Sequence, residues 1–299
     1  MDSDLVEYLQ RIELARPTHG PDEDYLIQLH IGHLTHIPFE TFDLIDLKQL
    51  NITPDYVFER IVRQRRGGVC YQMNGLFSSM LRKVGYHVQL IPCNVYDIEN
   101  DAYLHARSHL SLLVTLDNNE RFLCDVGFSR DFLTPLFFRM DCVQFASNGF
   151  FRLSRTSDGL FYQVERGFLP ETDPEPIASM RTRIVDIDPQ RIHWIVSYRF
   201  PFDFTDKPIA VDYFEDTCPF IVNSPKVILN HCSICRIHTV TPSVGACGIF
   251  GRELHTWVIN NGVETRQHHP IDQNDASLKQ LLNETFNLTI DRSITLVDK

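Results

Sequence analysis

The stretch Arg66-Gly67-Gly68-Val69-Cys70-Tyr71-Gln72-Met73-Asn74 places one thiol between a pair of glycines and the start of a helix. After it, apolar residues recur at helical spacing, at Met73, Leu76, Phe77, Met80, Leu81 and Val84. The same stripe, extended backwards, passes through Cys70, which predicts this cysteine in the first turn of a helix that ends near Gly85. Unpaired amides and the positive end of the helix dipole favour a thiolate there, and a thiolate is a nucleophile.

The thiol has a second interpretation. Free cysteine is among the most buried residue types and often packs as a small apolar side chain. A catalytic cysteine needs a general base nearby and a group that orients this base. The sequence has to supply both before Cys70 is assigned as a nucleophile.

Composition and charge exclude several classes of function. The 299 residues are 43% hydrophobic and 22% charged, and the formal net charge of -11 disfavours general binding to nucleic acid or to anionic membranes. The acidic start of the chain lacks the apolar core of a secretion signal, and no apolar window is long enough to span a membrane. The eight cysteines are therefore predicted to be reduced thiols, and the protein is predicted to be cytoplasmic. The arginines at 63, 65 and 66 either attract an anionic ligand, lie on a solvated helix face or pair with acidic residues of the chain.

The chain divides by pattern into three parts, and we expect an α+β fold. Residues 1–85 are expected to form a helical bundle with the cysteine. Residues 86–200 carry short runs rich in β-branched and aromatic residues, typical of a small antiparallel barrel or sandwich. Residues 201–299 are expected to form a mixed α/β region. The predicted helices cover 25–34, 54–65, 70–84 and 274–286, and the predicted strands cover 88–95, 110–116, 121–126, 149–153, 160–164, 227–239, 246–250, 253–260 and 263–266.

Residues 164–197, within the second part, contain four prolines and several acidic residues. This composition predicts a long surface insertion, which either restricts access to the site or is a passive loop.

His109 and Asp125 are the candidate partners of the thiol. His109 begins an apolar strand, and Asp125 is a lone acid inside the next apolar run, where a buried carboxylate needs a partner. A two-residue turn between the strands would put the two side chains on opposite faces. A three-residue loop at 117–119 puts them on the same side, one diagonal step apart. We predict the three-residue loop, because it ends in a left-handed residue and Asn119 tolerates that conformation.

Cys70, His109 and Asp125 together fit the chemistry of an activated nucleophile. The histidine takes the thiol proton, and the aspartate fixes the tautomer of the ring and stabilises the imidazolium.

Five segments in order resemble the arylamine N-acetyltransferase family over nearly the whole chain. The thiol motif is similar to the family's Arg-Gly-Gly-x-Cys pattern. Upstream, His36-Ile37-Pro38-Phe39-Glu40 resembles its Ile-Pro-Phe-Glu-Asn signature, with Thr41 in place of the final Asn. Downstream, His109-Leu110-Ser111 and Asp125-Val126-Gly127-Phe128 stand where the family's histidine and aspartate strands stand, and Leu282-Asn283-Glu284-Thr285-Phe286 resembles its last helix.

The resemblance implies a helical bundle carrying the cysteine, a β-barrel carrying the histidine and aspartate, an α/β lid, and a triad like that of cysteine proteases. It also implies a ping-pong reaction of xenobiotic metabolism with no permanently bound cofactor. Cys70 would take an acetyl group from acetyl-CoA and pass it to an arylamine, arylhydrazine or arylhydroxylamine. His109 would be the general base and acid, and Asp125 would orient it.

Further residues match family positions with assigned roles. The backbone amides of Cys70 and Tyr71 are candidate oxyanion donors. The side chains that match the acceptor pocket are Phe39, Val95 and Phe128. The segment 223–229 matches the family's CoA-associated pattern in part, which makes Ser224 and Lys226 the candidate CoA contacts. The side chains that match a structural ion pair beneath the site are Glu40 and Arg66.

Three other functions stay open. An N-acyltransferase with another acyl-CoA, such as propionyl- or malonyl-CoA, would use the same residues. A cysteine hydrolase or a transglutaminase-like enzyme would use the same triad. A metal-binding module is suggested by His231-Cys232-Ser233-Ile234-Cys235-Arg236-Ile237-His238. In a strand, however, Cys232 and Cys235 would point to opposite faces, and no second Cys-x-x-Cys pair exists, so no metal site is predicted. The sequence does not indicate an oligomeric state.

Overall fold

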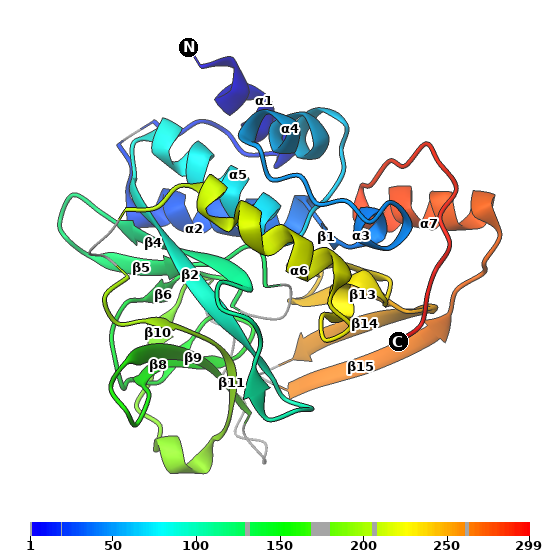
Figure 1. Ribbon diagram of the computed structural model, residues 1–299. Coiled ribbons are helices and arrows are strands. Elements are labelled where there is room, and N and C mark those ends of the chain that lie inside the picture. The colour runs from blue at the N-terminus through cyan, green and yellow to red at the C-terminus, as the bar shows by residue number, and fades with distance from the viewer. Residues whose placement is uncertain (1, 19, 129–131, 169–179, 205–207, 261–262) are drawn as a thin grey trace.

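A computed structural model describes residues 2–18, 20–128, 132–168, 180–204, 208–260 and 263–299. Its elements form a helical N-terminal part, a large antiparallel sheet and a smaller sheet with a C-terminal helix (Figure 1). Among these residues no helix combines the length and the apolar character needed to cross a bilayer.

Helices dominate the first 84 residues, as the sequence predicts. They are α1 (Ser3–Arg11), α2 (Glu23–His36), α3 (Phe42–Asp46), α4 (Pro54–Phe58), the π-helical segment η1 (Glu59–Arg63) and α5 (Cys70–Val84). The carboxylate of Asp22 caps α2 by accepting from the amide of Tyr25, and the helix ends before Pro38. The helix predicted over 54–65 is present as α4 followed by η1, which is wider than an α-helix.

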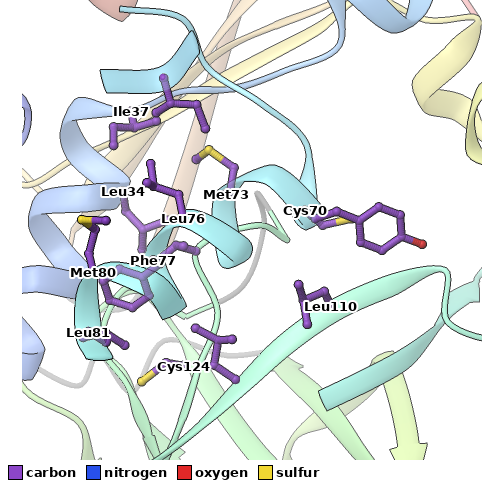
Figure 2. Packing of buried hydrophobic residues seen from close by; sticks show 14 of the residues in the cluster. Leu34, Ile37, Cys70, Met73, Leu76, Phe77, Met80, Leu81, Leu110 and Cys124 are labelled. Atoms are coloured by element: carbon purple, nitrogen blue, oxygen red, sulfur yellow. The ribbon is translucent and has the colours of Figure 1, made fainter. Parts of the chain in front are cut away.

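The cysteine helix α5 packs against α1, α4 and the second part of the chain. It ends at Gly85, which has the left-handed conformation (φ 118°) that glycine adopts without strain. Figure 2 shows its apolar side chains between Leu34 and Ile37, at the end of α2, and Leu110 and Cys124, in the second part of the chain. The predicted apolar stripe of this helix is therefore buried on both sides, and its orientation is determined by two neighbours.

The second part of the chain is one antiparallel sheet with the strand order β10-β7-β8-β9-β11-β2-β4-β5-β6, and β3 pairs with β2. The strands are β2 (His87–Asp97), β3 (Ala102–Tyr103), β4 (His109–Thr115), β5 (Arg121–Cys124), β6 (Leu136–Phe137), β7 (Gln144–Phe145), β8 (Phe150–Arg155), β9 (Phe161–Phe168), β10 (Arg183–Ile184) and β11 (His193–Pro201). The sheet curls (Figure 1). Over the described residues its ladder has two ends, at β10 and β6, so the predicted barrel is present as a curled, open sheet.

The β4–β5 hairpin has the predicted register. The amide of Leu116 donates to the carbonyl of Glu120 at 2.9 Å, and the amide of Asn119 donates back to the carbonyl of Leu116 at 2.9 Å. Asn119 is left-handed, with φ 65°. The three-residue loop is therefore confirmed, and it places His109 and Asp125 on the same side of the hairpin.

The structure corrects both ends of the predicted surface insertion. β9 continues to Phe168, and β11 starts at His193 and lies between β9 and β2, inside the sheet. Between them lie β10 and the 3-10 turn η2 (Pro189–Arg191), and residues 169–179 are outside the described part of the chain. The prolines suggested a loop throughout, whereas pairing with the distant strand β2 stabilises β11 as a strand.

The strand predicted over 227–239 is wrong in its first half. Ile228–Asn230 form a 3-10 turn, η4, and β12 begins at Ile234. The buried side chain of Asn230 donates to the carbonyls of Ile221 and Ser224 at 2.9 and 2.8 Å, which holds this segment against α6. That helix, α6 (Cys218–Asn223), and the preceding 3-10 segment η3 (Val211–Thr217) were not predicted.

The smaller sheet combines one strand of the helical part with four strands of the C-terminal part of the chain. Its strand order is β1-β12-β13-β14-β15, and its elements are β1 (Phe39–Glu40), β12 (Ile234–Thr239), β13 (Gly245–Phe250), β14 (Glu253–Asn260) and β15 (Val263–Pro270), followed by α7 (Asp275–Phe286). β1 comes from the helical part and pairs with β12, with Glu40 opposite Cys235. The hydroxyl of Thr41 extends this contact by accepting from the amide of Ile234 at 3.0 Å.

A buried ionic cluster lies beside β1. Its members are Glu40, Asp43, Arg60, Arg66 and Arg292. The Glu40 side chain is fully buried and accepts from Arg66 at 2.8 Å and from Arg60. Burial works against the charge of Asp43, but Arg60 and Arg66 hold the pKa of its carboxyl well below the usual range. The cluster therefore ties the helical part to the start of the smaller sheet and, through Arg292, to the C-terminal segment.

We predict that Glu40→Gln lowers the free energy of unfolding by about 3 kcal/mol, because it leaves two buried guanidinium groups with one carboxylate fewer. The matched control is Glu59→Gln, since Glu59 and its partner Arg63 are both exposed. This control should cost less than about 1 kcal/mol. Urea unfolding of the three proteins tests the prediction, and equal midpoints for the two variants would contradict it.

Candidate active site

Cys70 is the first residue of α5 and is buried, with 4% exposure. The turn that leads to it packs tightly, because a Cβ at Gly67 would collide with the carbonyl oxygen of Pro38. The side chain of Gln72 folds back and accepts from the amide of Val69 at 3.2 Å. Cys70, the predicted nucleophile, thus lies at a tightly packed helix start. The turn before it rests on Pro38, the residue that precedes β1.

His109 and Asp125 are directly hydrogen-bonded. Nε2 of His109 lies 2.6 Å from Oδ2 of Asp125, and both side chains are buried. Oδ1 of Asp125 accepts from the amide of Gly127 at 2.9 Å and from the side chain of Asn74 at 2.8 Å. Every polar atom of this carboxylate is therefore engaged, as a buried charge requires.

Asn74 is a residue of the site to which the sequence assigned no role. It lies one helical turn after Cys70, and its Nδ2 also donates to the carbonyl of Leu110 at 2.6 Å. Its Oδ1 accepts from the amide of Val126 at 2.9 Å. This single side chain therefore joins the cysteine helix to β4 and to the segment that follows β5. The four-residue spacing from Cys70 was the available signal, but its partners become visible only after folding.

The environment of His109 favours its charged form. Burial opposes the imidazolium, but the Asp125 carboxylate and a hydrogen bond with Cys70 raise the pKa of His109 to about 10. Burial likewise opposes the charge of Asp125, and His109, Asn74 and the Gly127 amide together lower the pKa of that carboxyl. An imidazolium beside a thiol and a carboxylate is the arrangement that can stabilise a thiolate.

Gly127 determines how closely the hairpin approaches the cysteine. A Cβ at this position would lie 2.7 Å from Cα of Cys70 and 2.7 Å from Nδ2 of Asn74. Only a residue without a side chain allows the strand end to rest on the helix start at this distance.

The three predicted acceptor-pocket residues make different contacts, and among them Phe128 contacts the ring of His109. Phe128 lies edge-on to His109, with ring centroids 5.1 Å apart, and 5.2 Å from Tyr198. Val95 pairs with Tyr198 in the β2–β11 ladder. Phe39, in β1, forms a bridge with Gly68 of the turn before the cysteine. Tyr198 itself, 4.9 Å from His109, was not predicted.

The predicted CoA contacts and the possible metal cluster lie on other segments. Ser224 follows α6, and its hydroxyl accepts from the amide of the exposed Lys226 at 3.3 Å. Cys232 precedes β12 and Cys235 lies within it, so the two are not in one strand as assumed. Both are free and buried, and the described residues contain no group of three or more ligand side chains arranged to hold a metal.

We predict that Gly127→Ala slows alkylation of Cys70 by iodoacetamide on the order of 100-fold, because the added methyl displaces the hairpin from the helix start. The rate is followed by mass mapping of the Cys70 peptide. Gly20→Ala is the control, since a Cβ at Gly20 meets nothing within 4 Å. Equal alkylation rates in the two variants would show that this close contact is not required.

Comparison with known proteins assigns the family. The model of the N-acetyltransferase family matches residues 22–295. The sequence is 26% identical to arylamine N-acetyltransferase 1 of Bos taurus over 98% of this chain and 96% of that protein. The fold is similar to that of the arylamine N-acetyltransferase from Salmonella typhimurium, with a TM-score of 0.76 and 23% identity over 99% of this chain and 96% of that one. It is also similar to the Mycobacterium marinum arylamine N-acetyltransferase in complex with CoA, with a TM-score of 0.74 and 20% identity over 95% and 92% of the two chains. Because the family model covers most of its length, the chain belongs to the arylamine N-acetyltransferase family, a family of acyltransferases.

Proposed function

We propose that the protein acetylates arylamines, arylhydrazines or arylhydroxylamines by a ping-pong reaction in which Cys70 carries the acetyl group from acetyl-CoA. Family membership supports the overall reaction. The observation that supports the assignment of residues is the 2.6 Å hydrogen bond between His109 and Asp125 beside a cysteine at a helix start. The CoA bound to the Mycobacterium marinum relative supports acetyl-CoA as the donor.

In the first half-reaction His109 takes the proton of the Cys70 thiol, which leaves a thiolate beside an imidazolium, the form of His109 that its surroundings favour. The thiolate attacks the carbonyl carbon of the acetyl thioester, and a new carbon–sulfur bond forms. The bond to the sulfur of CoA then breaks, and His109 returns the proton to the leaving thiolate. Asp125 holds the imidazole in the required tautomer and stabilises its charged form during both transfers.

The negative oxygen of each tetrahedral intermediate needs hydrogen-bond donors. The first amides of a helix have no partner within the helix, and those of Cys70 and Tyr71 stand at the start of α5. We assign these two amides as the oxyanion donors. The positive end of the helix dipole acts in the same direction.

In the second half-reaction the amine nitrogen attacks the carbonyl carbon of acetyl-Cys70. The proton of the nitrogen moves to His109, and the carbon–sulfur bond breaks to restore the Cys70 thiolate. Phe39, Val95 and Phe128 are proposed to line the acceptor site, because flat apolar walls suit an aromatic amine. The edge-on contact of Phe128 with His109 supports this position for the acceptor ring.

The remaining assignments concern support and organisation. Ser224 and Lys226 are proposed CoA contacts, and the pair of Glu40 and Arg66 is proposed to be structural, since Arg66 is already bonded to two buried carboxylates. We propose three domains, at 1–85, 86–200 and 201–299: the helical bundle, the curled antiparallel sheet and the α/β lid. All eight cysteines are free, which supports the cytoplasm as the proposed compartment.

We predict that incubation with acetyl-CoA adds one acetyl group to the wild-type protein and none to Cys70→Ala, as measured by intact mass. The matched control is Cys142→Ala. Cys142 is a partly exposed free cysteine in a loop, so its replacement should not change the gain in mass of one acetyl group. The same gain in Cys70→Ala, or no gain in the wild type, would rule out the acetyl-cysteine intermediate. Replacing acetyl-CoA by propionyl- or malonyl-CoA in this assay identifies the preferred donor. Rapid loss of the group to water without an amine would favour the hydrolase.

We predict that Asp125→Asn slows release of CoA in the first half-reaction on the order of 10⁴-fold, because the amide no longer selects the tautomer in which His109 accepts the thiol proton. Without the carboxylate, the pKa of His109 should also fall from about 10 towards its usual range. The less stable imidazolium stabilises the Cys70 thiolate less, so the pH profile of the rate should move to higher pH. Asp117→Asn, in the exposed loop of the same hairpin, is the control. An Asp125→Asn rate close to that of this control would remove Asp125 from the mechanism.

A further inference from the structure

His30 contacts the main chain of Asp125, whereas His109 contacts its carboxylate. His30 belongs to α2 and is fully buried. Its Nε2 lies 3.2 Å from the amide nitrogen of Asp125, and its Nδ1 lies 3.0 Å from the carbonyl oxygen of Leu133. The two ring nitrogens therefore connect the residue after β5 with a segment eight residues further along the chain.

These two partners determine the tautomer of the ring. The amide of Asp125 can only donate, so Nε2 of His30 has to be the acceptor. The carbonyl of Leu133 can only accept, so the proton lies on Nδ1. The titratable neighbours of the ring are Asp125 and His33, and burial lowers the pKa of His30 to about 4. The ring is thus neutral at neutral pH, as acceptance by Nε2 requires.

The amide of Asp125 needs this acceptor because of where it lies. β5 ends at Cys124, so the ladder with β4 stops one residue earlier. The amide is buried, and a buried amide without a partner is rare in folded proteins. The ring of His30 is held in place by stacking on Phe132, with centroids 5.9 Å apart, and by an edge contact with Phe77 at 5.8 Å.

We infer that His30 is a positioning residue, whose Nε2 fixes the main chain of Asp125 so that its carboxylate stays aligned with His109. The inference rests on the proposed role of Asp125. The side chain of Asp125 has its own partners in Asn74 and the amide of Gly127, but these hold only one carboxylate oxygen, Oδ1. The hydrogen bond from the amide of Asp125 to His30 fixes the main-chain nitrogen bonded to the Cα from which the side chain starts. A small displacement there changes the direction of the hydrogen bond to His109.

Two substitutions of His30 distinguish a role in positioning Asp125 from a general contribution to stability. The amide of an asparagine occupies the place of Nδ1, so His30→Asn keeps the donor to Leu133 and loses the acceptor for Asp125. The amide of a glutamine reaches the place of Nε2, so His30→Gln keeps the acceptor for Asp125 and loses the donor to Leu133. Each variant loses one buried hydrogen bond, so a merely structural role predicts similar losses of activity and of thermal stability in both.

We measure alkylation of Cys70 by iodoacetamide across pH, followed by mass mapping, below the unfolding temperature of every variant. His30→Asn should slow alkylation at neutral pH at least about tenfold and move the profile to higher pH, because a misaligned Asp125 stabilises the imidazolium less. His30→Gln should stay close to the wild type. Equal rates in the two variants, or a slower His30→Gln, would overturn the inference.

A second measurement observes the His30 ring in the wild-type protein, where both of its hydrogen bonds are intact. Nitrogen-15 NMR of histidine-labelled protein should show a neutral ring protonated at Nδ1 for His30, assigned by its disappearance in either variant. A ring protonated at Nε2, or a charged ring at neutral pH, would overturn the inference. Neither experiment uses acetyl-CoA, so failure of the acetyl-transfer proposal and failure of this one are distinguishable.

Discussion

The carboxylate of Asp125 is the constraint around which the site is built. It is buried at the end of β5, where an unpaired charge would be strongly destabilising. Its partners come from separate parts of the chain: His109 from β4, Asn74 from α5 and the amide of Gly127 from its own strand end. Satisfying this one charge therefore requires the hairpin and the cysteine helix to dock in a single arrangement, and that arrangement brings His109 to Cys70.

A second buried charge holds the cysteine from the other side. Glu40 is bonded to Arg60 and Arg66, and its strand β1 pairs with β12 of the smaller sheet. Gly67 and Gly127 permit close approach on these two sides. The start of α5 is thus fixed between a charged cluster and a hydrogen-bonded hairpin. Such rigid support suits a reaction in which proton transfer requires a fixed, short distance between the thiol and the imidazole.

Local patterns in the sequence predicted the elements whose stability is local. The apolar period after Cys70 predicted α5 and its end at Gly85, and the Asn119 turn predicted the register of the β4–β5 hairpin. Elements stabilised by distant segments were missed or misplaced. β11 was placed in a loop because its partners β9 and β2 are not visible in its composition. The two residues of β1 were too few to signal a strand until β12 paired with them.

The sequence by itself determined which residue types are present for the chemistry and the helix and hairpin that carry them: a thiol at a helix start, and a histidine and an aspartate facing the same side of one hairpin. Only the tertiary structure decided how these meet. The bonds of Asn74 to Leu110 and Val126, and of His30 to the amide of Asp125, join elements that are far apart in sequence. Such bonds depend on the packing of α2, α5 and the hairpin against one another, and no periodicity within a single segment encodes that packing.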